Sequence, residues 1–182
     1  MFIGDGSTKL SCKRALPGLP NLEINITGIN AALSRGPEVS IATPPKALEL
    51  ETIFNSAIAE ALELRAVIRF EHTQAMRSVN NIRARVMLER VDSVLKNKSL
   101  SSTADYRKAA LEADREYQDA LDVSDALNAL SEFIDGKLEA LKNYYFNAKD
   151  VIRSFSSENG IMGKRQVSVS SEWPDSNRFM EE

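Results

Sequence analysis

The middle of the chain, residues 46–153, contains no proline and a single glycine, Gly136. Proline breaks a helix interior and glycine weakens it, so a stretch this long without them can form very long helices. The same stretch is rich in Ala, Leu, Glu, Arg and Lys, which are strong helix formers. A β-sandwich or barrel needs turn residues at roughly every tenth position, and the stretch lacks them. We therefore expect an all-α fold.

Composition divides the chain into three regions. Residues 1–45 hold five of the six prolines and five of the eight glycines, so we expect an irregular arm with little helix. Residues 46–155 are the helical region, and residues 156–182 are a polar, serine-rich tail. In the arm, residues 22–27 alternate apolar and polar side chains, which is the period of a short strand. Residues 166–170 are a second candidate strand that pairs with it, the alternative being a disordered tail.

Two long helices are expected in the helical region. Thr43 is a candidate N-cap, with Pro44 at the first helical position, where the missing N–H costs nothing. Apolar spacing continues this helix to about residue 96. The break at 97–103 ends with a serine or threonine that caps the second helix. A helix of about 50 residues is about 75 Å long, and a short link folds two of them into an antiparallel hairpin or coiled coil.

The second helix carries the clearest periodic pattern in the sequence. Its apolar residues fall on the a and d positions of a heptad repeat. Gly136 lies within this pattern and marks either a close helix crossing or a break, and we expect a kink or crossing rather than a full stop of the helix. Further apolar residues widen the stripe beyond what one partner helix covers, so we expect the chain to form a homo-oligomer. The predicted oligomer seam consists of Ile134, Leu138, Leu141, Tyr145 and Ile152.

Charge is unevenly distributed along this acidic chain, whose net charge is −3 and whose pI is near 5.4. Residues 65–98 carry eight basic and three acidic side chains, a local charge of +5. Residues 105–135 carry nine acidic and three basic side chains, a local charge of −6. One interpretation is that the two helices pair along their flanks. The other is that the basic residues toward the hairpin tip face outward and bind phosphates: Arg83, Arg85, Arg90, Lys96 and Lys98.

Three runs within residues 78–155 resemble the T4-type recombination mediator family of tailed phages. They read IRARVMLER from residue 82, ADREYQ from residue 113 and FIDGKLEALK from residue 133. The resemblance implies a ring-forming helical protein that binds single-stranded DNA and helps a recombinase displace the single-strand-binding protein. It further implies that Arg83, Arg85 and Arg90 contact DNA. The residues it assigns to assembly are Leu138, Leu141, Tyr145 and Ile152.

The scarcity of cysteine and histidine restricts the chemistry of the chain. One cysteine, Cys12, and one histidine, His72, exclude an internal disulfide framework, a Cys/His zinc site and a Cys–His catalytic pair. We expect a protein that is not an enzyme and that carries no cofactor or metal. The chain starts without a secretory signal, and no apolar run approaches the ~18 residues of a membrane helix. We therefore expect it in the cytoplasm, that of the host cell if a phage encodes it.

Two other functions remain open from the sequence. One is a structural protein of a phage virion or similar assembly, whose arm clasps a neighbouring subunit. The other is a helical chaperone or adaptor that binds a protein through the same amphipathic surface. Trp173 and Phe179 in the tail are candidates for docking a partner, the alternative being a disordered end. Salt-sensitive binding to single-stranded DNA would separate the recombination accessory from both.

Overall fold

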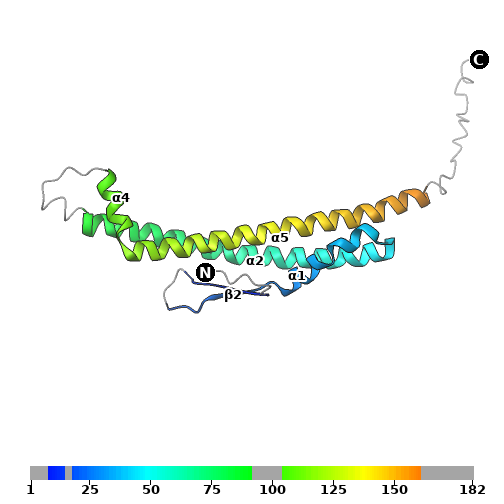
Figure 1. Ribbon diagram of the computed structural model, residues 1–182, viewed down its shortest axis with the longest axis horizontal. Helices are drawn as coiled ribbons and strands as arrows, with labels where there is room; N and C mark the ends of the chain where they lie inside the picture. Colours follow the sequence, from blue (N-terminus) through cyan, green and yellow to red (C-terminus); the bar gives the residue numbers. More distant parts are fainter. Residues whose placement is uncertain (1–7, 15–17, 92–103, 161–182) are drawn as a thin grey trace, which may run out of the picture.

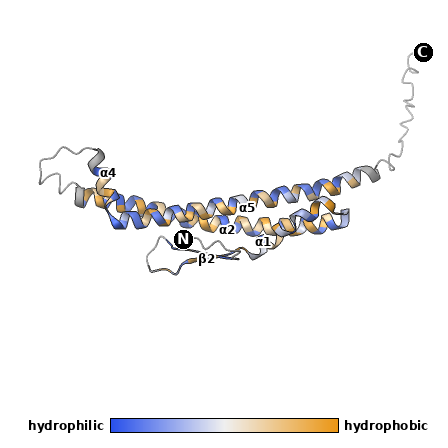
Figure 2. Ribbon diagram, in the orientation of Figure 1, coloured by the Kyte–Doolittle hydropathy of each residue, from blue (hydrophilic) through white to orange (hydrophobic). Residues whose placement is uncertain are grey.

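The computed structural model describes residues 8–14, 18–91 and 104–160. Two long helices, α2 (Pro44–Val86) and α5 (Arg115–Gly160), run antiparallel and side by side along the length of the molecule (Figure 1). Hydrophilic and hydrophobic residues alternate along both of them (Figure 2), as in amphipathic helices. A short helix, α4 (Ala104–Glu112), precedes α5 at the tip of this hairpin. The expected helical hairpin is confirmed.

The two long helices keep one register along the hairpin. Near its open end, Lys149 Nζ lies 3.9 Å from a carboxylate oxygen of Glu51. Far along the hairpin, the Ser124 hydroxyl donates to the sulfur of Met76 at 3.1 Å. The two residue numbers add to 200 in both pairs, so neither helix slips against the other over this distance. A constant register is what two straight helices with the same apolar period produce.

The predicted start of the first long helix is confirmed. Thr43 has an extended backbone (φ −74°, ψ 159°), and Pro44 is the first helical residue. The Thr43 carbonyl accepts a hydrogen bond from the Ala47 N–H at 2.8 Å, but the Thr43 side chain makes no capping bond. At its other end α2 continues as a π-helical turn, η2 (Met87–Val91). The predicted break at 97–103 lies outside the described residues.

The arm contains more regular structure than the sequence predicts. It holds a two-stranded antiparallel sheet of β1 (Lys9–Cys12) and β2 (Leu22–Asn25), then helix α1 (Thr27–Ser34) and the 3-10 helix η1 (Gly36–Ile41). The expectation of little helix in the arm is therefore wrong. β2 confirms the strand predicted at the start of residues 22–27, and its partner is β1. The other candidate strand lies outside the described residues.

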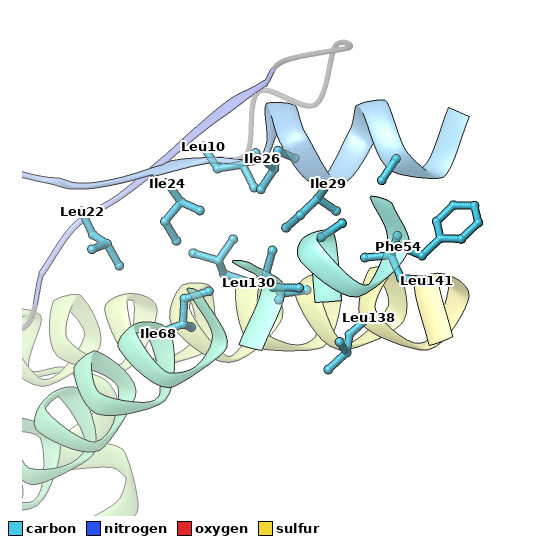
Figure 3. Close-up of a cluster of buried hydrophobic side chains, with 14 of the residues drawn as sticks. Leu10, Leu22, Ile24, Ile26, Ile29, Phe54, Ile68, Leu130, Leu138 and Leu141 are labelled. Atoms are coloured by element: carbon cyan, nitrogen blue, oxygen red, sulfur yellow. The ribbon is translucent and has the colours of Figure 1, made fainter. Parts of the chain in front are cut away.

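The arm packs along one side of the hairpin and forms a third layer of its core (Figure 1). Alternate strand residues, including Leu10, Leu22 and Ile24, are buried, while the residues between them are exposed. Figure 3 shows these side chains pointing toward the long helices, where Ile68 and Leu130 are fully buried. The described part of the arm thus covers its own hairpin.

A surface ion cluster fastens the arm to the start of α2. Arg35, which follows α1, donates to Glu38 at 3.0 Å and to Glu49 at 3.1 Å, and Lys46 donates to Glu49 at 2.9 Å. The hydrogen bond from Arg35 lowers the pKa of Glu38, and those from Lys46 and Arg35 lower the pKa of Glu49. Because these groups are solvated, the cluster orients η1 on α2 more than it stabilises the fold.

The joint between α4 and α5 was not expected from the sequence. Helical structure is interrupted at Ala113 and Asp114, and Asp114 is buried with 2% exposure. Its carboxylate accepts a hydrogen bond from the Tyr117 N–H at 3.0 Å, which is the geometry of an N-cap. Asp114 therefore starts α5 as a separate helix.

Gly136 marks neither a helix break nor a close crossing. α5 runs through it without interruption, and a Cβ built there would have no neighbour within 4 Å. Gly36, in contrast, packs against the ring of Tyr144, which leaves no room for a Cβ. The expected crossing at Gly136 is wrong, because open space surrounds this position of the helix.

We expect Gly136→Ala to stabilise the chain by about 1 kcal/mol, since alanine restricts the unfolded chain and fits the open helix surface. Gly36→Ala is the matched comparison and should destabilise it, because the added methyl displaces Tyr144. Urea unfolding followed by circular dichroism measures both. Equal effects of the two substitutions would contradict this description of the two glycines.

Candidate nucleic-acid interface

The tip half of α2 carries arginines on one stripe. Arg83 lies 14 residues after Arg69, and Arg90 follows seven residues later in η2. Fourteen residues are close to four turns of an α-helix, so Arg69 and Arg83 lie nearly in line along α2, and Arg90 lies in the π-helical turn that follows. Arg69 and Arg83 are exposed, and no described residue forms an ion pair with Arg83. We call Arg69, Arg83 and Arg90 the basic stripe.

Arg69 shares its acidic partner with a second arginine. A guanidinium N–H of Arg65 donates to Asp135 of α5 at 3.3 Å, and Arg69 lies 3.7 Å from the same carboxylate. Two positive groups therefore face one negative group, which leaves an excess positive charge at this point of the hairpin. The side chain of Arg69 is 58% exposed, so a phosphate can reach it.

Arg85 is paired within the chain. It forms a hydrogen-bonded ion pair with Glu116 at the start of α5, and this bond raises the pKa of the Arg85 guanidinium. Together with the Asp135 contacts, the pair supports the interpretation that the oppositely charged helices attract each other along their flanks. The sequence-predicted DNA contact at Arg85 therefore competes with Glu116, whereas Arg83 has no such competitor among the described residues.

The remaining predicted contacts are less defined. Arg90 lies in η2, and its side chain is outside the described part of the structure. Lys96, Lys98, Trp173 and Phe179 lie outside the described residues, so their predicted roles stay predictions.

Most residues of the predicted oligomer seam are buried within a single chain. Ile134 and Leu141 are fully buried and Leu138 is 3% exposed, all in the core formed with α2 and the arm. The heptad pattern is therefore satisfied within one chain, which corrects the assignment of these three residues to contacts between copies. Tyr145 and Ile152 are half-buried. Tyr145 packs against the same core, with Lys149 over its ring at 4.9 Å.

Sequence reasoning missed Arg69 as part of the candidate interface. Counting charges by segment located the basic region but did not show on which face of the helix each arginine lies. The spacing of 14 and then seven residues from Arg69 to Arg83 to Arg90 was the available signal. What the sequence could not provide was the partner of each arginine, since Asp135 and Glu116 lie on the other helix.

The described part of the chain gives little support for a metal site or a membrane-spanning helix. Among those residues, no three His, Cys, Asp or Glu side chains are grouped so that they could hold a metal ion. None of the described helices is long and apolar enough to cross a bilayer. No family model, curated protein or solved structure matches the chain.

We expect Asp135→Asn to destabilise the hairpin by about 1 kcal/mol, because Arg65 is partly buried and loses its charged partner. Asp125→Asn, at an exposed position of the same helix without an ion pair among the described residues, should change stability by less than about 0.5 kcal/mol. Chemical unfolding of both variants checks this. An unchanged midpoint for Asp135→Asn would show that the contact orients the arginines without stabilising the fold.

Proposed function

We propose that this chain is a non-enzymatic accessory protein of phage DNA recombination, which binds single-stranded DNA along the basic stripe and assists recombinase loading. The observation that carries the proposal is the exposed pair Arg69 and Arg83, which lie nearly in line on α2. Arg69 shares the Asp135 carboxylate with Arg65, and Arg83 forms no ion pair among the described residues. The resemblance of residues 78–155 to phage recombination mediators supports the recombination context.

The spacing of the basic stripe suits a charged polymer. At 1.5 Å per residue, Arg69 and Arg83 are about 21 Å apart along the helix, and Arg90 follows in η2. A flexible single strand can place phosphates at such intervals. Contacts of this kind release counterions and weaken steeply as salt increases. The chain has few aromatic residues for base stacking, so binding should be indifferent to base sequence.

Fluorescence anisotropy of a labelled oligo-dT, titrated at several salt concentrations, tests the proposal. The wild-type chain should bind at low salt. The triple variant Arg69→Ala, Arg83→Ala, Arg90→Ala should bind at least about tenfold more weakly, and its logarithmic salt slope should be shallower by about 2, because three phosphate contacts are lost.

A matched control removes the same amount of charge elsewhere. Lys13, Lys142 and Arg153 are exposed and lie away from the basic stripe, so replacing all three by alanine should leave most of the affinity. Equal losses in the two triple variants would show that only total charge matters. No binding by the wild type at low salt would reject the proposed function.

A structural role in an assembly is the second candidate, and exposed apolar side chains on α2 and η2 favour it. Phe70 is 62% exposed and Leu88 is 70% exposed, on a helical rod that already buries another face. Large apolar side chains in contact with water commonly mark a protein interface. A chain that assembles but does not bind oligo-dT would support this second function.

A further inference from the structure

The face of α2 that points away from the core carries a second row of residues, which is apolar at seven of twelve positions and charged at one, and which continues into η2. Its large members are Leu48, Leu62, Phe70 and Leu88, which are 57%, 43%, 62% and 70% exposed. Steps of three or four residues connect them through Thr52, Asn55, Ala59, Ala66, Thr73, Arg77, Asn81 and Ala84, which are also exposed. Phe70 comes two residues after the fully buried Ile68, about 200° around the helix. We call this row, from Leu48 to Leu88, the outer stripe.

The outer stripe is long, straight and almost uncharged. Forty residues of helix extend about 60 Å, and spacing close to 3.6 keeps the row in line along that length. The positions of this row are exposed throughout, and the only charged one is Arg77. A helix face in contact with water is normally rich in charged residues. α2 therefore has two faces suited to packing, and the arm and α5 cover only one of them.

The outer stripe is complementary to itself when a copy is reversed. Around a centre at residue 68, an antiparallel second helix places Phe70 opposite Ala66 and Leu48 opposite Leu88. A large side chain thus meets a small one near the centre, and leucines meet at both ends. In a two-fold interface, residue i of one copy contacts residue j of the other, and residue j of the first copy contacts residue i of the second. The outer stripe meets this condition. We propose that two copies of this chain pair through the outer stripes of their α2 helices, in antiparallel orientation.

The position of Arg77 favours the antiparallel arrangement over the parallel one. Arg77 lies opposite Ala59, whose small side chain leaves room for it, and Glu63 lies one turn further along the partner helix. Both Arg77 and Glu63 are exposed and form no ion pair among the described residues. Antiparallel pairing brings these opposite charges together twice, by symmetry. Parallel pairing instead sets Arg77 against Arg77 and leaves Ala66 against Ala66.

The pairing does not depend on the proposed DNA binding. Neighbouring residues on a helix point about 100° apart, so Arg69 points about 100° away from Phe70 and lies at the edge of the outer stripe, seven residues after Leu62. A substitution of Phe70 therefore tests the dimer, and the variants of the basic stripe test the DNA contact. Either proposal can fail without the other.

Sedimentation equilibrium of the full chain over a wide concentration range tests the dimer. The wild type should be dimeric, and Phe70→Glu should be monomeric with unchanged circular dichroism, because the substitution buries two carboxylates near the two-fold axis. Phe146 on α5 is 56% exposed and lies off the stripe, so Phe146→Glu is the matched control and should stay dimeric. A monomeric wild type, or equal effects of the two substitutions, would overturn the proposal.

Cysteine cross-linking tests the orientation. In a Cys12→Ser background, Thr52→Cys and Ala84→Cys are placed in separate chains, which are then mixed and oxidised. The two positions face each other in the antiparallel dimer but lie about 48 Å apart within one chain. The mixture should therefore give a disulfide that joins position 52 of one copy to position 84 of the other.

Two results of this experiment would contradict the arrangement. Cross-linking of the Thr52→Cys chain with itself would indicate parallel helices. A dimer that forms no link between positions 52 and 84 would place the contact on another face. Either result would overturn the proposal.

Discussion

The apolar groove between the two long helices is the constraint on which the rest of the structure depends. Two helices in contact cover only part of each other's apolar face, and the uncovered part must be buried by something else. Here the arm supplies that third layer, with one face of its small sheet and the side chains of Ile26 and Ile29 fully or almost fully buried. The hairpin can therefore bury its wide apolar stripe without a second copy.

This solution explains which expectations from the sequence succeeded. The long helices, the start at Thr43 and the strand at Leu22 follow from local propensities, and all three are present. The heptad in α5 was also real, but a period shows that a face is apolar and not what covers it. The sequence therefore placed Leu138 and Leu141 in contacts between copies, whereas they pack within one chain.

The parts that could not be predicted depend on contacts distant in sequence. α1 has no side-chain cap hydrogen bond and no acidic first turn, so its helical state depends on burying Ile29 and Ala32 against the hairpin. The shared carboxylate of Asp135 likewise depends on the register of the two helices. The basic region was visible in the sequence, but its division into paired and unpaired arginines was not, because the pairing residues lie on α5.

α2 emerges as the element that organises the molecule, because three of its faces have different roles. The inner face holds the core, the basic stripe lies on a flank, and the outer stripe faces away from the core. In the proposed antiparallel dimer, the two-fold axis is perpendicular to the layer formed by the two α2 helices, so both basic stripes lie on the same side. Arg69 of each copy falls near the centre, and the two Arg83 positions lie about 45 Å apart along the layer. A strand long enough to span them would contact both copies at once, which raises affinity without any new type of contact.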